Sequence, residues 1–153
     1  MQNKTLMKCI LLPLLTGAVS GFLTRNGMRE FMQMPQPALS PPSWAFPIVW
    51  TILYVMMGIA SYEILLSETT EKVSALSVYG TQLIFNFCWS LIFFCLKNYL
   101  LAFVWLIAMW GLILAATVKF WKIHRQAALL MVPYLLWTTF AAYLNFGVYA
   151  MNR

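Results

Sequence analysis

The sequence predicts an all-α fold, an integral membrane bundle of five transmembrane helices in one domain that covers residues 1–153. Of its residues, 62% are hydrophobic and only 9% are charged, whereas about a quarter are charged in ordinary soluble domains. Uncharged stretches long enough to cross about 30 Å of hydrocarbon as a helix recur along the chain. These stretches lack the alternation of polar and apolar residues that the strands of a membrane barrel require.

The charged residues also indicate what surrounds the protein. The net charge is +6, and the Lys and Arg residues mostly flank the apolar stretches instead of forming a dense stripe. Basic residues in such positions suit lipid headgroups and topology signals better than nucleic-acid phosphates. We therefore expect membrane lipid as a partner, no nucleic acid, and a multi-pass membrane location, which in a bacterium would be the cell membrane.

The first predicted span lies between Lys8 and Arg25, which enclose 16 uncharged residues. An alternative is a cleaved signal peptide, because basic residues precede the apolar run and Ala18-Val19-Ser20 resembles a cleavage site. The apolar run continues past this site through Phe22 and Leu23, which favours a membrane span.

Residues 25–43 are predicted to form a long loop that acts as a lid. Prolines fix φ and remove backbone donors, so we expect no helix before about Ser43; they stand at positions 35, 37, 41 and 42. Apolar residues such as Phe31 and Met34 are unusual in a solvated linker. A long loop of this composition is expected to fold over a cavity.

Three further uncharged runs follow the second span, with 24 residues between Lys72 and Lys97, 21 between Lys97 and Lys119, and 27 between Arg125 and Arg153. Lys97-Asn98 leaves almost no loop, so spans three and four must form a tight antiparallel pair. The numbers of Lys and Arg on the two sides weakly favour an N-terminus inside the cell. The predicted spans are 5–24, 44–65, 74–96, 99–118 and 127–150.

The sequence lacks the residues that most enzymes require. The only charged residues inside the predicted spans are Lys8 and Glu63, and each lies near an end of its span. The single histidine, His124, falls in a basic segment that we expect to be a solvated loop. No carboxylate pair, no nucleophile–base pair and no metal-ligand spacing is present, which argues against hydrolases and charge-coupled transporters. We therefore expect no metal site and no bound cofactor.

Uncharged polar and aromatic residues instead share helical faces in three spans. Their amide and indole groups are costly against lipid, so these faces should turn inward. They either hold the helices together or line a pocket for a flat apolar ligand, and the predicted lid favours the pocket. The faces comprise Trp50, Tyr54, Met57 and Gly58; Gln82, Asn86, Trp89 and Phe93; and Trp137, Phe140, Ala141, Leu144 and Asn145.

Gly17 and Gly21 of the first span are four residues apart, a spacing that lets two helix backbones approach closely. The pair could support a homodimer or pack against another helix of the same chain. The spacing alone is compatible with either interpretation.

Three segments resemble the translocator protein family, also called tryptophan-rich sensory or peripheral benzodiazepine-receptor-like proteins. The first is Pro41-Pro42-Ser43-Trp44-Ala45-Phe46-Pro47-Ile48-Val49-Trp50 with Leu53-Tyr54 and Met57-Gly58. The second is Gln82-Leu83 with Asn86, Trp89 and Phe93-Phe94, and the third is Pro133-Tyr134-Leu135-Leu136-Trp137 with Phe140-Ala141 and Leu144-Asn145. The resemblance runs from about Phe31 to the C-terminus.

This resemblance implies five packed transmembrane helices, often in a homodimer, around a pocket closed by the first loop. It also implies ligands such as porphyrins and sterols, although Phe146 stands where the family's sterol motif has tyrosine. Some members promote light-dependent porphyrin breakdown, and for that activity Trp50 and Trp137 would be the catalytic residues. The implied ligand-binding residues are Trp50, Tyr54, Asn86, Trp89, Phe93, Trp137, Phe140 and Ala141.

Residues and resemblance together predict a membrane-embedded binding protein for porphyrins and other flat hydrophobic ligands, acting as a sensor or transporter. Light-dependent oxidative degradation of bound porphyrin is the alternative. A small solute or ion channel is a third hypothesis, which the charge-free spans argue against.

Overall fold

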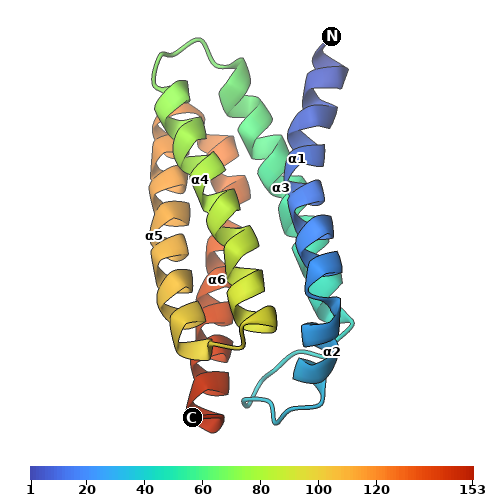
Figure 1. Cartoon of the computed structure of the whole chain (residues 1–153). Coiled ribbons are helices and arrows are strands. Elements are labelled where there is room, and N and C mark those ends of the chain that lie inside the picture. The colour runs from blue at the N-terminus through green and yellow to red at the C-terminus, as the bar shows by residue number, and fades with distance from the viewer.

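The computed structural model describes residues 1–153 and consists of helices joined by short connections (Figure 1). Five of the helices are long and apolar enough to cross a membrane, which confirms the predicted five-helix membrane bundle. The two termini lie at opposite ends of the bundle (Figure 1), as an odd number of crossings requires. The elements are α1 (Gln2–Leu23), α2 (Arg25–Met32), α3 (Ala45–Leu66), α4 (Lys72–Ser90), the π-helical η1 (Leu91–Cys95), α5 (Tyr99–Ile123) and α6 (Arg125–Met151).

The prediction that the whole of residues 25–43 forms a loop was wrong, because α2 occupies Arg25–Met32. The prolines that disfavour helix begin only at position 35, so nothing in their geometry prevents an earlier helical turn. The buried hydroxyl of Thr24 donates to the carbonyl of Ser20 at 2.7 Å and marks the junction between α1 and α2. Residues 33–43 form no helix, as predicted, and α3 begins one residue later than expected, at Ala45.

The basic segment around His124 is also more helical than predicted. Helix α5 continues to Ile123 and α6 begins at Arg125, so one residue connects them. The Nδ1 atom of His124 accepts a hydrogen bond from the backbone N–H of Ala127 at 3.3 Å, and His124 therefore caps α6. A capping side chain satisfies one of the free donors at a helix N-terminus.

Spans three and four form the tight antiparallel pair that the short link predicts. Lys97 adopts a left-handed conformation with φ of 53°, which reverses the chain between η1 and α5. Asn98 then caps α5 by accepting from the backbone N–H of Leu101 at 3.1 Å.

Helix α1 runs along α3 (Figure 1), and two glycines permit the close approach. A Cβ atom added at Gly58 would lie 2.5 Å from Cα of Ile10, and one added at Gly17 would overlap the ring of Tyr54. Gly17 therefore packs against another helix of the same chain, which is the second of the two interpretations of the Gly17–Gly21 spacing. A Cβ atom at Gly21 would meet nothing within 4 Å.

The solid core occupies the half of the bundle that lies away from residues 25–43. Its largest side chains are fully buried and come from α3, α5 and α6; they include Met57, Ile64, Phe120, Met131 and Tyr134. A cavity lies in the other half of the bundle and is the candidate site.

Candidate ligand-binding pocket

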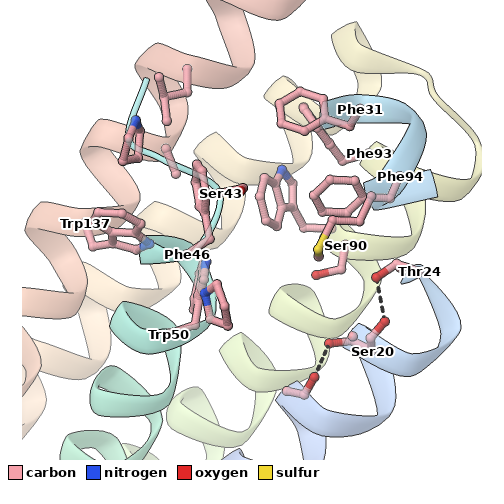
Figure 2. Close-up of a pocket in the computed structure, with 18 of the residues that line it drawn as sticks. Ser20, Thr24, Phe31, Ser43, Phe46, Trp50, Ser90, Phe93, Phe94 and Trp137 are labelled. Carbon is pink, nitrogen blue, oxygen red and sulfur yellow. Dashed lines mark hydrogen bonds between the residues drawn. The ribbon is translucent and has the colours of Figure 1, made fainter. Parts of the chain in front are cut away.

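A cavity of about 730 Å³ lies at the end of the bundle that α2 and residues 33–44 cover. This volume falls within the range of about 300–1,000 Å³ typical of small-molecule pockets. The lining residues come from α1, α2, the 33–44 segment, α3, α4, η1 and α6. Figure 2 shows open space between Trp50 and Trp137 on one side and Ser20, Thr24 and Ser90 on the other.

Three tryptophans form one aromatic wall of this cavity. The ring of Trp50 lies 6.4 Å from that of Trp89 and 6.5 Å from that of Trp137, measured between centroids. Tyr54 stacks on Trp50 with centroids 5.6 Å apart and ring planes 30° apart. Large aromatic faces in contact with a cavity suit a flat, apolar ligand.

A second aromatic group lies where the cavity meets α2. Phe31 of α2 packs edge-on against Phe93 and Phe94, with centroid distances of 5.3 and 5.7 Å. The backbone N–H of Leu96 donates to the carbonyl of Leu91 at 3.0 Å, an i→i−5 bond that defines the π turn. Such a turn holds an extra residue, and both Phe93 and Phe94 line the cavity from it.

Beneath the cavity, four polar side chains form a continuous hydrogen-bonded chain. The hydroxyl of Tyr54 donates to Oδ1 of Asn86, Nδ2 of Asn86 donates to the hydroxyl of Tyr134, and that hydroxyl donates to Oε1 of Gln82, each at 2.8 Å. Buried polar groups satisfied in this way stabilise one arrangement of the helices. Asn86 does not line the cavity, but it positions Tyr54, which does.

Besides Asn86, one other expected ligand-binding residue, Phe140, lies outside the cavity. Trp89 lines the cavity, and its Nε1 donates to Oδ1 of Asn145 at 3.1 Å. Trp137 and Ala141 also line it, whereas Phe140 packs on the far side of Trp137 and lines a separate groove. Of the eight expected ligand-binding residues, six line the cavity: Trp50, Tyr54, Trp89, Phe93, Trp137 and Ala141.

Helix α1 supplies cavity residues that sequence reasoning missed. The hydroxyl of Ser20 donates to the carbonyl of Gly17 at 3.1 Å, and Thr24 is bonded to the same helix, so both oxygens keep free lone pairs (Figure 2). The spacing of Gly17, Ser20, Gly21 and Thr24 is that of one helical face of small residues. Small residues on one helical face also permit helix packing, so this pattern alone does not indicate a cavity.

None of the 26 residues that line the cavity is charged, and no group of three or more His, Cys, Asp or Glu residues exists that could hold a metal ion. Burying an unpaired charge in such surroundings is strongly unfavourable. The arrangement therefore suits the uncharged part of a hydrophobic molecule.

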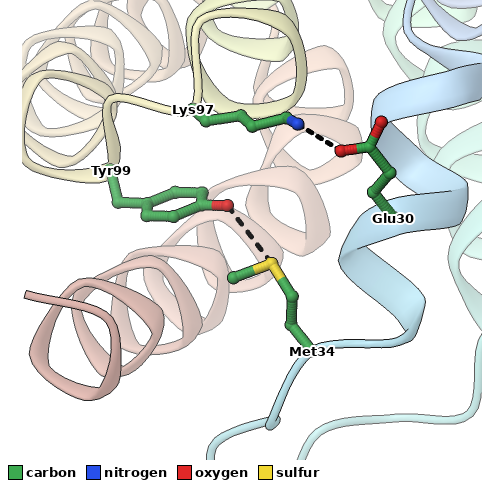
Figure 3. Close-up of polar contacts among 4 residues, drawn as sticks. All are labelled: Glu30, Met34, Lys97 and Tyr99. Carbon is green, nitrogen blue, oxygen red and sulfur yellow. Dashed lines mark hydrogen bonds and ion pairs between the residues drawn. The ribbon is translucent and has the colours of Figure 1, made fainter.

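The covering segment, which comprises α2 and residues 33–44, is tied to the rest of the bundle by three contacts. Lys97 forms a hydrogen-bonded ion pair with Glu30, and the hydroxyl of Tyr99 lies 3.4 Å from Sδ of Met34 (Figure 3). The hydroxyl of Tyr143 donates to the carbonyl of Ala38 at 2.8 Å. The hydrogen bond to Glu30, and then the charge of its carboxylate, raise the pKa of Lys97 above its ordinary value.

Comparison with known proteins agrees with this architecture. The model of the TspO/MBR family matches residues 9–151. The tryptophan-rich protein TspO of Chlorobaculum tepidum is 36% identical over 99% of this chain and 98% of its own length. The tryptophan-rich sensory protein of Cereibacter sphaeroides is 36% identical over 76% of this chain and 73% of its own length. The translocator protein of Homo sapiens is 36% identical over 88% of this chain and 81% of its own length. With five apolar helices long enough to span a bilayer, the chain is a multi-pass membrane protein that belongs to the TspO/MBR family.

Proposed function

We propose that this protein binds porphyrins and other flat hydrophobic molecules within the membrane and acts as a sensor or transporter of them. The observation that carries the proposal is the 730 Å³ cavity, which three tryptophans line and which no charged residue enters. Relatives named translocator protein and tryptophan-rich sensory protein support the two modes of action.

The ring geometry supports a planar ligand. The ring planes of Tyr54 and Trp89 are tilted by 30° and 34° from that of Trp50. Trp137 stands nearly perpendicular to Trp50, at 87°. A flat ring system can therefore stack on one surface while its edge meets another indole.

Titration of the purified protein in detergent with protoporphyrin, followed by tryptophan fluorescence, tests the proposal. Ala141 is 8% exposed and lines the cavity, so Ala141→Phe should fill part of the recess. Overpacking of a rigid site weakens affinity by up to roughly a hundredfold. Ala150→Phe is the matched control, because Ala150 is an exposed residue of the same helix. Equal affinity of both variants and the unmodified protein would place the ligand elsewhere.

Light-dependent oxidation of bound porphyrin is a second candidate function, and one observation favours it. The indole rings of Trp50 and Trp137 lie 6.5 Å apart and both line the cavity, so a bound ring would lie beside two oxidisable side chains. Under light and air, Trp137→Phe should slow the loss of porphyrin absorbance, because phenylalanine is harder to oxidise. Trp121→Phe, at an exposed tryptophan outside the cavity, is the control. Equal bleaching with both variants, or loss in the dark, would exclude this mechanism.

A further inference from the structure

Trp137 separates the internal cavity from a groove on the outside of the bundle. The groove has a volume of about 430 Å³ and lies between α3 and α6. Trp137 is the one residue common to the linings of the cavity and the groove. A change in the position of its indole would therefore join the two spaces.

The groove faces the lipid at mid-depth of the two spans. Ile52 of α3 and Leu136 of α6 line it and are 54% and 65% exposed. Seven of its eight lining residues are hydrophobic, and none is charged. A hydrophobic molecule dissolved in the bilayer can reach this surface without crossing a layer of headgroups.

The indole of Trp137 is held less firmly than those of Trp89 and Trp105. Its buried Nε1 atom has no hydrogen-bond partner, whereas Nε1 of Trp89 is bonded to Asn145 and Nε1 of Trp105 to the carbonyl of Phe85. Its neighbours are the rings of Phe46, Trp50 and Phe140, at centroid distances of 6.0, 6.5 and 5.6 Å. Displacement of this indole breaks no hydrogen bond.

The backbone beside Trp137 is weakened as well. Pro133 lies inside α6 one turn before Trp137 and lines the groove. Proline cannot donate to the carbonyl four residues earlier, so this turn of α6 lacks one backbone hydrogen bond. The covering segment, by contrast, is tied by the pairs Lys97–Glu30, Tyr99–Met34 and Tyr143–Ala38.

We propose that the groove between α3 and α6 is the access site through which flat hydrophobic ligands pass between the bilayer and the cavity, with Trp137 as its gate. The identity of the ligand rests on the proposed function above. The route itself depends only on the positions of Trp137 and the groove.

The first test uses no ligand. In a variant without native cysteines, Ala141→Cys places a thiol in the cavity, and N-(1-pyrenyl)maleimide dissolved in phosphatidylcholine vesicles labels it from the bilayer. Leu136→Phe narrows the groove and should slow this labelling by about tenfold, since a higher barrier lowers the rate. Leu129→Phe is the matched control, because Leu129 is an exposed leucine two turns earlier on α6 that lies outside the groove. Unchanged labelling in Leu136→Phe, or equally fast labelling by a charged, membrane-impermeant methanethiosulfonate, would overturn the proposal.

The second test uses protoporphyrin and the protein with native cysteines in the same vesicles. A gate changes the barrier and not the end states, so Leu136→Phe should lower the association and dissociation rates together by about tenfold and change Kd by less than about twofold. A change in Kd with an unchanged association rate would mean that Leu136 affects the bound state and not the route. If protoporphyrin fails to bind the unmodified protein, the proposed function fails, and the labelling experiment still decides the route.

Discussion

The hydroxyl of Tyr54 donates to Oδ1 of Asn86 at 2.8 Å, so a residue of the cavity wall is positioned by a residue that does not touch the cavity. Asn86 is 1% exposed and is also bonded to Tyr134. Both polar atoms of its amide are therefore occupied by protein groups. This arrangement gives Asn86 a structural role, which can be distinguished from ligand contact.

Asn86→Leu is expected to lower the free energy of unfolding by about 1–3 kcal/mol, because it removes hydrogen-bond partners from two buried tyrosine hydroxyls. Thermal unfolding in detergent measures this change. Tyr54→Phe should have a smaller effect, since it leaves the bond between Asn86 and Tyr134 intact. Asn152→Leu, at an exposed asparagine, should unfold like the unmodified protein. Normal unfolding of Asn86→Leu combined with lost porphyrin binding would show instead that Asn86 contacts the ligand.

The example of Asn86 shows what helical periodicity can and cannot predict. Spacing correctly placed Asn86 and Trp89 on one inward face, because a face depends only on the 3.6-residue repeat. It could not predict which level of the bundle is hollow. That depends on Tyr134, whose hydroxyl reaches between the helices and fills the space beside Asn86.

Phe140 illustrates a second limit of the same reasoning. Residues 137 and 140 differ by about 60° around a helix, and that angle is enough to place one ring against the cavity and the other against the outer groove.

Helix α2 was missed for a different reason. It has only eight residues, and it packs on η1 so closely that a Cβ atom at Gly27 would overlap the carbonyl of Phe94. Such tertiary contacts are not visible in a local sequence pattern.

Gly17 and Gly21 form a matched pair for a test of helix packing. Gly17→Ala is expected to destabilise the fold by about 1–3 kcal/mol, because its Cβ would overlap the ring of Tyr54 and force a shift in a packed region. Gly21→Ala meets no atom within 4 Å and should stabilise α1 by about 0.5–1 kcal/mol, since alanine favours helix over glycine. Thermal unfolding in detergent compares the two. Equal melting temperatures would show that α1 does not pack on Tyr54 as described.

The ion pair between Lys97 and Glu30 should affect how tightly the covering segment is held. Both side chains are about half exposed, at 48% and 60%, so the pair is screened by salt and its effect is modest. In Glu30→Gln, hydrogen exchange of the backbone amides in residues 33–43 should accelerate by at most about fivefold, and high salt should remove the difference. Tyr143→Phe removes an uncharged hydrogen bond to Ala38. The acceleration of exchange in this variant should therefore not depend on the salt concentration.

The raised pKa of Lys97 determines how this contact depends on pH. Glu30 favours the charged form of the amine, so the contribution of Lys97 is complete below the ordinary lysine pKa of 10.5 and is lost as the pH rises through the raised value. After correction for intrinsic exchange, the difference between Glu30→Gln and the unmodified protein should stay constant from pH 6 to pH 9. A difference that disappears within this interval would mean that Lys97 is not the partner that holds Glu30.

The uncharged lining of the cavity predicts how affinity depends on the number of carboxylates in a porphyrin. No Lys, Arg or His side chain enters the cavity to pair with an anion, and each unpaired carboxylate withdrawn from water costs several kcal/mol. A ligand with few carboxylates can keep them at the membrane surface while its ring lies against the wall formed by Trp50 and Trp89. Uroporphyrin carries carboxylates around its whole edge and cannot keep all of them at the membrane surface.

We therefore expect protoporphyrin dimethyl ester to bind at least as tightly as protoporphyrin, and uroporphyrin to bind at least about a hundredfold more weakly than protoporphyrin. Fluorescence titration with all three in one detergent measures the series. Comparable affinities across the series would mean that the ring lies outside the cavity, where water still reaches its edge.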